Sequence, residues 1–452
     1  MRNLNIMNPT RTLTARATIL VAAVGLLLTG CGAKTPDALV RREVAPAAVS
    51  DVTKPCTREA AQSTAPADPA PAGLAATFDA AGDKIVLSGG QNVTVPALAA
   101  KLNKPDLLKE TAPGEWMLNK TIEINQGASL KIAAPTVRWL KLRGDDTGFA
   151  SVKALGGGID ISGTCVTSWN EGKGAVDEDY ANGRGFLLAR DGAQMTIDKA
   201  ELQYLGFGDV ESYGLAWRTE GSGGHITNSL IAHLYFGVYS FDVGGLTISD
   251  NEVRDNVLYG IDPHTGSHNL TIERNVVHDN GKHGIILAED CVDSVIRDNV
   301  VYRNQHHGIV LYLHSDRNTI EGNETFGNAA QGININEASN NTIKSNRVYD
   351  NTESGIGIGQ TAKDNVVEDN DVRGNQQDGL RLVSEASQTD VRNNVIGENV
   401  RYGVYVDSDG PFAMAGNTIW KNRTGVMLKG NTTDPSSGNS IFSNTEMDVK
   451  NG

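Results

Sequence analysis

The sequence predicts an all-β protein whose main part is a right-handed parallel β-helix, a solenoid of short strands stacked coil upon coil. Three observations predict this class: glycine is common (50 of 452 residues), aromatic residues make up only 6%, and one pattern recurs about every 23 to 24 residues. A repeat this short cannot bury its apolar side alone, whereas stacked repeats can, with strands about 4.8 Å apart. The strong preference for right-handed parallel crossovers sets the hand.

The repeat is defined by two frames that advance in step along the chain. The first reads T-I-x-x-N-x-V-x-x-N, and its first asparagine falls at Asn251, Asn275, Asn299, Asn323, Asn346, Asn370, Asn394 and Asn417. The second places glycine before alternating apolar residues, at Gly214, Gly237, Gly260, Gly284, Gly308, Gly332, Gly355, Gly379, Gly403 and Gly425. Asparagine recurring at one corner predicts an inward ladder of side chains. The leucine framework of leucine-rich repeats is missing from the sequence.

The segment before the repeats has the features of an export signal. Residues 1–30 are predicted to be a lipoprotein signal peptide, because arginines precede a short apolar run at Ile19–Leu28. The run ends in Leu-Thr-Gly-Cys, which resembles the bacterial lipobox and implies acylation of Cys31. Residues 31–74 are predicted to be a flexible tether. We therefore expect an exported protein, lipid-anchored on the outer side of the cytoplasmic membrane or in the periplasm.

The remaining chain is predicted to divide into a cap, a solenoid and a second cap. Residues 75–160 are expected to form an N-terminal cap and the first strands, with a short helix within Val95–Lys109. Residues 161–430 are expected to form the β-helix, and residues 431–452 a C-terminal cap. Export permits a disulfide between Cys56 and Cys165, although sequence alone does not establish pairing. Cys291 is expected to be a small buried residue.

Stacking predicts which side chains share one outer face. Positions one before, two after and four after each glycine of the second frame should point outward, and those one and three after should point inward. The outward set is rich in polar, aromatic and titratable residues between Tyr213 and Tyr312. All nine histidines lie between His225 and His314. Because histidine exchanges protons near neutral pH, this face is the predicted site.

One coil interrupts the apolar alternation at Asp262–Pro263–His264. Pro263 stands where neighbouring coils carry an inward Val, Ile or Leu, and proline cannot donate to the sheet ladder. A departure from an otherwise consistent pattern tends to mark function. The net charge of −14 argues against a broad nucleic-acid-binding surface, although an acidic glycan needs only local cations.

The residues Tyr259–Gly–Ile–Asp–Pro–His264 resemble the signature of bacterial mannuronan C5-epimerases, which convert mannuronate to guluronate within alginate. The chain looks most similar to the periplasmic branch without calcium repeats, over roughly residues 115–430. The resemblance also takes in Thr167–Trp169, Ser212–Gly214, Phe236–Tyr239 and Lys282–Ile286. It implies an isomerase whose partner is an acidic, alginate-like polysaccharide.

The resemblance also implies roles for individual residues. Inversion at C5 needs a base and an acid on opposite sides of the sugar, and a neutralised carboxylate. His264 and Tyr259 would be the proton-transfer pair, with the direction open, Asp262 would orient or tune them, and His307 matches a site histidine. The groups expected to bind the substrate are Arg218, Tyr239, Lys282, His283, His306 and Tyr312.

The chain departs from the family pattern around the signature. Thr265 stands where the periplasmic branch usually has a second Asp, and Glu289 stands where an Arg neutralises the carboxylate. Another branch uses an Arg beside the later histidine, where this chain has His306. The candidates for neutralising the carboxylate are Arg218, Lys282, or a protonated His283 or His306.

Two other functions compete with the epimerase. A polysaccharide lyase needs the same base and neutralised carboxylate, and a non-catalytic glycan-binding β-helix would need neither. A hydrolase is weaker, since Asp262 lacks an evident carboxylate partner other than Glu289 or Asp242. We expect no cofactor and no metal; a metal site at Asp262, His264 and His283 is an alternative. Calcium at acidic turns is a further alternative, but the nonapeptide calcium repeat is missing from the sequence.

Overall fold

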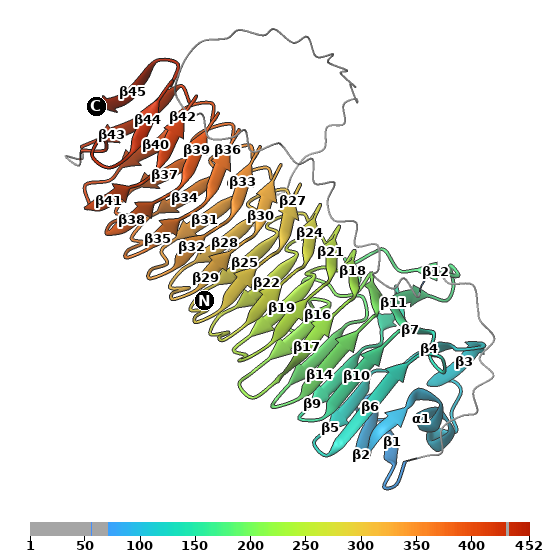
Figure 1. Ribbon diagram of the computed structural model, residues 1–452. Helices are drawn as coiled ribbons and strands as arrows, with labels where there is room; N and C mark the ends of the chain where they lie inside the picture. Colours follow the sequence, from blue (N-terminus) through green and yellow to red (C-terminus); the bar gives the residue numbers. More distant parts are fainter. Residues whose placement is uncertain (1–55, 57–70, 431–433) are drawn as a thin grey trace. The chain divides into compact units, whose positions relative to one another are not determined.

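The computed structural model describes Cys56, residues 71–430 and residues 434–452. The expected signal peptide, Cys31 and most of the tether lie outside these described residues. The described chain is a stack of short strands joined by tight turns, and successive strands of each sheet are parallel apart from two antiparallel pairs at the N-terminal end (Figure 1). This confirms the predicted parallel β-helix.

Three sheets, here called A, B and C, run along the stack, and each coil contributes to them in turn. Sheet A contains β1 (Ala75–Asp79), β2 (Lys84–Thr94), β5 (Ile122–Asn125), β9 (Val152–Leu155), β13 (Leu187–Arg190), β16 (Leu215–Arg218), β19 (Val238–Phe241), β22 (Ile261–His264), β25 (Ile285–Ala288), β28 (Ile309–Tyr312), β31 (Ile333–Asn336), β34 (Ile356–Gly359), β37 (Leu380–Val383), β40 (Tyr402–Asp407), β43 (Thr424–Lys429) and β45 (Met447–Asn451). Sheet A carries the predicted site.

Sheet B follows sheet A in each coil. The second half of β2, a strand of sheet A, also pairs with the first strand of sheet B. It contains β6 (Ala128–Ala133), β10 (Gly158–Ser162), β14 (Gln194–Asp198), β17 (Gly223–Thr227), β20 (Thr247–Ser249), β23 (Thr271–Glu273), β26 (Val295–Arg297), β29 (Thr319–Glu321), β32 (Thr342–Lys344), β35 (Val366–Glu368), β38 (Thr389–Arg392) and β41 (Phe412–Ala415).

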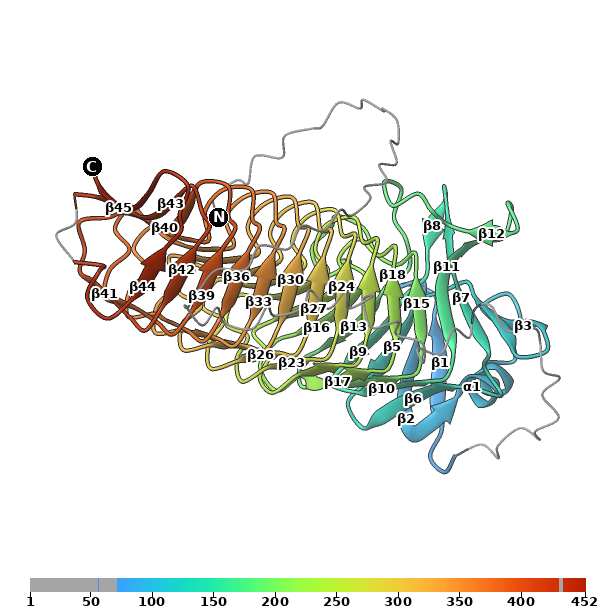
Figure 2. The same ribbon diagram turned by 45° about the horizontal axis from the view of Figure 1, so that its top comes forward.

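Sheet C completes each coil, and Figure 2 shows its strands in succession. It contains β3 (Leu108–Ala112), β4 (Glu115–Leu118), β7 (Trp139–Asp145), β11 (Cys165–Asn170), β15 (Glu201–Gln203), β18 (Leu230–Ala232), β21 (Glu252–Arg254), β24 (Val276–His278), β27 (Val300–Tyr302), β30 (Glu324–Phe326), β33 (Arg347–Tyr349), β36 (Asp371–Arg373), β39 (Val395–Gly397), β42 (Thr418–Trp420) and β44 (Ser440–Phe442). The short strands β8 (Gly148–Phe149) and β12 (Ala175–Val176) pair antiparallel with β7 and β11.

The core lies inside the coils, where like residues stack on like. In sheet A, Ile285 pairs in register with Ile261 and Ile309, and all three are fully buried. Leu287, two residues after Ile285, is also fully buried. The predicted inward positions, one and three after each glycine, are therefore confirmed. Glycine begins each coil because space is short there: a Cβ on Gly284 would lie 2.4 Å from Val301 Cγ1.

Two ladders of buried asparagines run along the corners beside sheet C. In the first, Asn299 Nδ2 donates to Asn323 Oδ1 at 2.9 Å, and Asn323 Nδ2 donates to Asn346 Oδ1 at 3.0 Å. The second asparagine of the repeat forms an equivalent ladder, as between Asn304 and Asn328 at 3.0 Å. Each amide also satisfies a backbone group, so the predicted inward ladder is confirmed.

Removing one member of the ladder should destabilise the stack. In Asn323→Ala, the backbone carbonyl of Ile296 loses its 2.8 Å donor and the Asn299 amide loses its acceptor, both in the interior. We expect the free energy of unfolding to fall by about 2–4 kcal/mol, because buried polar groups are left unpaired. Thermal unfolding followed by circular dichroism measures the loss. The exposed Asn182→Ala is the control, and an equal, small effect of both variants would contradict the ladder's role.

The N-terminal end of the stack is covered by the helix α1 (Val95–Leu102), which lies within the predicted segment (Figure 1). The Thr94 side chain accepts from the Ala97 backbone N–H and begins the helix, which buries Val95, Ala97 and Leu98. At the other end, β44 and β45 add strands to sheets C and A, so residues 434–452 continue the stack.

The disulfide that the sequence permits is present, and the remaining cysteine of the described chain is buried as expected. Cys56 and Cys165 form a disulfide, and Cys291 is a free, buried thiol. Among the described residues, no helix has both the length and the apolar character needed to cross a membrane.

Candidate functional site

The candidate site lies on the outer face of sheet A, over strands β16 to β28. Register places Arg218, Phe241 and His264 in one column, which continues to Ala288 and Tyr312. A second column places Ala216 beside Tyr239, and Tyr239 beside Asp262. The structure therefore brings together the outward columns that periodicity predicts.

The second column is covered by a layer of aromatic side chains. Tyr239 is only 5% exposed and packs with Phe236, Tyr213 and Ala216, with Tyr259 packed against their edge. Asp262, its register neighbour, is 1% exposed. Tyr239 and Asp262 thus form the floor of the site, whereas Tyr312, at 39%, is the most exposed of the predicted substrate-binding aromatic residues.

Asp262 is a carboxyl group in an apolar environment. Both of its side-chain oxygens are buried, and neither has a hydrogen-bond partner among the described residues. Burial raises the pKa of Asp262 to about 8, opposed by the charge of Lys282. At neutral pH the group is therefore mainly a neutral acid, and it makes no hydrogen bond to His264 or Tyr259 in the part of the chain that is described.

Tyr259 lies just before β22 and keeps its proton. Burial raises the pKa of its phenol, and the Asp262 carboxyl adds to the effect. The Lys282 ammonium donates to Tyr259 Oη at 2.7 Å, and the Tyr259 ring stacks on His283, with ring centres 5.3 Å apart. The phenol is thus a proton donor held beside a cation.

His264 lies at the other end of β22 and is half-buried. Burial lowers the pKa of its imidazole, Glu289 opposes this effect, and Arg218 adds to it. Its Nδ1 atom lies 2.7 Å from Thr265 Oγ1, and the Thr265 hydroxyl donates to Glu289 Oε2 at 2.9 Å. A neutral imidazole at this position can accept a proton.

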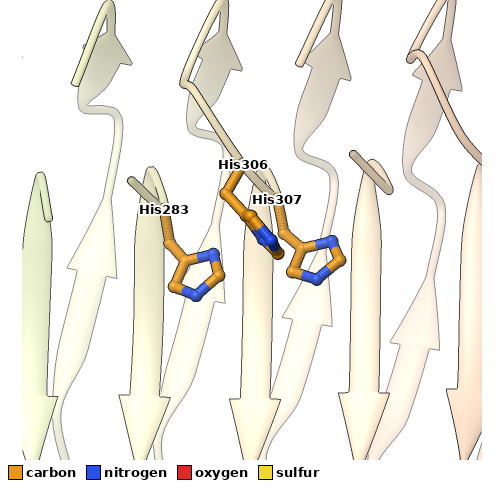
Figure 3. Close-up of side chains that lie close together, drawn as sticks. All are labelled: His283, His306 and His307. Carbon is orange, nitrogen blue, oxygen red and sulfur yellow. The ribbon is translucent and has the colours of Figure 1, made fainter. Parts of the chain in front are cut away.

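Three histidines lie in the two coils that follow Tyr259, and Figure 3 shows their side chains close together. The rings of His283 and His307, one coil apart, stack with centres 5.2 Å apart, and His306 lies edge-on to both. Burial lowers the pKa of each imidazole, and at His283 the neighbouring His307, His306 and Lys282 add to the effect. These groups are therefore neutral near pH 7.

The proton of His307 can be placed from its contacts. The backbone N–H of Gln331 donates to His307 Nδ1 at 3.0 Å, so Nδ1 holds the lone pair. A neutral imidazole has one N–H, which must then be on Nε2. His307 therefore presents a hydrogen-bond donor at Nε2. The buried Nδ1 of His283 has no partner within the described chain.

Arg218 lies two coils before His264 in the same column. Its guanidinium stacks over Phe241 at 4.6 Å and lies 4.0 Å from a Glu211 carboxylate oxygen. Arg218 is thus partly engaged by the protein itself. Lys282, in contrast, donates to Tyr259 Oη at 2.7 Å and so lies directly beside the signature residues.

Thr265 and Glu289 depart from the family pattern in sequence, and their contact was not predicted. The signal was present, since Glu289 follows Thr265 by one coil of 24 residues, and equivalent positions of successive coils stack. Neither the hydroxyl–carboxylate contact nor the Gln331–His307 bond was expected, because both depend on side-chain or turn geometry.

Comparisons with known proteins agree with this description. A family model described as a right handed beta helix region matches residues 293–445, and one described as periplasmic copper-binding protein (NosD) matches residues 183–363. The mannuronan C5-epimerase of Pseudomonas aeruginosa is 31% identical over 199 residues, covering 41% of this chain and 36% of that protein. The mannuronan C5-epimerase AlgG of Azotobacter vinelandii is 29% identical over 200 residues, covering 41% and 37%.

A solved structure extends the similarity over more of the fold. The crystal structure of the periplasmic alginate epimerase AlgG matches with a TM-score of 0.69 at 24% identity, covering 74% of this chain and 84% of that one. The matches to the curated epimerases cover little more than a third of their length. The comparisons confirm the parallel β-helix fold and the resemblance to the mannuronan C5-epimerases.

Proposed function

We propose that the protein is an epimerase that inverts C5 of D-mannuronate residues in an alginate-like polyuronate. The observation that carries the proposal is a pair of side chains on one face of sheet A: a protonated Tyr259 just before β22 and a neutral His264 at its end. A base and an acid on two sides of one sugar are what inversion requires. The similarity to named epimerases supports the same reaction.

The protonation states give the direction of transfer. His264, neutral because burial lowers its pKa, removes the C5 proton, and the electron pair moves into the carboxylate as an enediolate. Tyr259, protonated because burial raises its pKa, then donates its proton to the opposite face of C5. Lys282 stabilises the phenolate that forms. Exchange with solvent returns both side chains to their starting states.

The enediolate needs positive charge and hydrogen-bond donors near its oxygens. Protonated His283 or His306 fits poorly, because burial and neighbouring charges lower their pKa values. Lys282 supplies a fixed cation beside Tyr259, and His307 supplies an Nε2–H donor one coil beyond His283. We propose that these two groups bind the uronate carboxylate, with Arg218, His306 and Tyr312 holding neighbouring parts of the polymer.

Incubation with polymannuronate in deuterated water tests the function. An epimerase gives guluronate carrying deuterium at C5, seen by NMR, without chain cleavage. An unsaturated product absorbing in the ultraviolet would instead show a lyase. Binding with neither exchange nor cleavage would identify a non-catalytic glycan-binding protein.

Tyr259→Phe tests the assigned direction. Without the phenol the opposite face of C5 receives no proton, but His264 can still remove a proton and return a deuteron to the same face. We expect inversion to fall by about 10²-fold or more, whereas deuterium still enters mannuronate at C5. NMR of the recovered polymer separates the two products. Loss of exchange together with inversion would contradict the assignment and favour Tyr259 as the base.

We also propose that the protein works outside the cytoplasm and is anchored through lipid on Cys31. The Leu28–Cys31 pattern supports the anchor, and the periplasmic designation of a structural relative supports the compartment. Metabolic labelling with a fatty-acid probe, in wild type and Cys31→Ser, tests the anchor. Label that persists in Cys31→Ser would contradict it.

The match to a copper-binding family makes the three histidines a metal candidate, since their ligand atoms lie within 4.8 Å of one another. The hydrogen bond of His307 does not fit a metal ligand. A metal-bound histidine donates through its other nitrogen, whereas His307 Nδ1 accepts from Gln331 and leaves the proton on Nε2. We propose that turnover needs no metal. Dialysis against EDTA should leave activity unchanged, and restoration by Cu²⁺ or Zn²⁺ of activity lost to EDTA would contradict this.

A further inference from the structure

We propose that Glu289, acting through the hydroxyl of Thr265, holds the His264 imidazole with its proton on Nδ1 and so makes Nε2 the atom that accepts a proton. The inference rests on the proposed function for its catalytic meaning, but its geometry is independent of the substrate. Glu289 and Thr265 are then positioning residues for the base.

The relay follows from counting hydrogens. A threonine hydroxyl has one hydrogen, and a carboxylate can only accept, so the 2.9 Å contact to Glu289 Oε2 uses that hydrogen. The 2.7 Å contact between Thr265 Oγ1 and His264 Nδ1 then needs its hydrogen from the imidazole. The lone pair of the neutral ring is left on Nε2.

A third contact favours the other tautomer. The Thr265 backbone N–H lies 3.0 Å from His264 Nδ1 and would need a lone pair there. The tautomer protonated at Nε2 satisfies this longer contact. The single hydroxyl hydrogen of Thr265 can then lie either toward Nδ1 or toward the carboxylate, so one of the two shorter contacts is left without a hydrogen. Protonation at Nδ1 satisfies both shorter contacts, one of them to a charged acceptor, and charge-assisted hydrogen bonds are the stronger ones. We therefore assign the proton to Nδ1.

The charges around His264 give the relay a second consequence. Glu289 raises the pKa of the imidazole, while burial and Arg218 lower it; Tyr239 lies beside the ring with centres 6.0 Å apart, and Asp262 is mainly neutral at pH 7. Glu289 therefore stabilises the imidazolium that forms when His264 takes the C5 proton. A base oriented by a third group is a recurring arrangement in proton-transfer sites.

The relay gives a physical meaning to the two departures from the family pattern. Glu289 in place of the family's Arg, without Thr265, would put an unpaired carboxylate near the site. Thr265 in place of the family's Asp, without Glu289, would remove a negative charge. Together they place one carboxylate a single hydroxyl away from His264. The two positions compensate each other because they are one coil apart.

The test combines NMR with kinetics on the full chain labelled with ¹⁵N-histidine, where His264 is assigned by difference from His264→Gln. In Glu289→Leu, which removes the acceptor, and in Thr265→Val, we expect the His264 ¹⁵N shifts to move toward the tautomer protonated at Nε2. We also expect kcat/KM to fall by roughly 10²-fold. In Glu289→Gln its acidic limb should move to lower pH. Thr265→Ser should keep the wild-type tautomer, and Asp290→Asn, which removes the adjacent exposed carboxylate, should leave the limb in place.

The outcomes distinguish the relay from the reaction. Tautomer shifts in Glu289→Leu and Thr265→Val, with the wild-type tautomer in Thr265→Ser, support the relay even if wild type proves inactive on polymannuronate. An unchanged tautomer in Glu289→Leu, or an equal shift in Asp290→Asn, overturns it even if the protein is an active epimerase. Should Thr265→Val fail to fold, the comparison of Glu289→Leu with Asp290→Asn still decides.

Discussion

Substituting His264 by Gln should abolish nearly all C5 exchange and inversion, lowering kcat/KM by about 10²–10⁴-fold. Glutamine preserves much of the size and polarity of the imidazole but cannot accept a proton near neutral pH. Because His264 is the proposed base, both incorporation of deuterium and inversion should fall together, unlike in Tyr259→Phe. NMR of polymannuronate recovered from deuterated water measures both.

The matched control for this substitution is His225→Gln, on β17 of sheet B rather than on the face of sheet A that carries the site. It should retain wild-type turnover and thermal stability. If His264→Gln turned over substrate as fast as His225→Gln, the base would have to be another group.

Asp262→Asn should remove a large pH dependence of stability. Burial raises the pKa of Asp262 to about 8 in the folded protein, against about 3.9 in an unfolded chain. The folded state therefore holds a proton that the unfolded state releases above about pH 4. The contribution of this proton to the free energy of unfolding is fully present below about pH 4. It is lost as pH rises toward 8, by on the order of 5 kcal/mol in total. Asparagine has nearly the same shape and does not titrate.

Calorimetric melting at pH 5 and pH 8.5 checks this expectation. The melting temperature of Asp262→Asn minus that of wild type should increase as pH rises. The exposed Asp290→Asn controls for loss of a carboxylate in the same region. Parallel melting temperatures for wild type and Asp262→Asn would show that Asp262 is ionised in the folded protein.

The fold was predictable because a solenoid turns sequence spacing into geometry. The glycine and asparagine frames fixed which residues stack, and the columns containing Tyr239, Asp262 and His264 follow from that register. The helix α1 was also predictable, from its composition and position. The separation of the outer face into a buried floor and an exposed rim was not, because it depends on how Phe236, Tyr213 and Tyr259 fill space above the sheet.

The chemistry of the site was less predictable than its location. Sequence indicates that His264 and Tyr259 are near each other, but their protonation depends on burial and on neighbours such as Asp262 and Glu289. The tautomer of His307 depends on one backbone N–H in the next coil. Such contacts are set by side-chain and turn conformations that periodicity leaves free.

The stacked register also limits how a polymer can be processed. The scaffold repeats along its axis, but within the described stack only the coil of β22 combines Tyr259, Asp262 and His264, and the two coils after Tyr312 present amides and glycines such as Asn334 and Gly357. If the protein is the proposed epimerase, a bound polymer therefore meets one reactive position on a long, repetitive track. After each event it must advance or leave, so the pattern of modified units would record how far the chain moves between events.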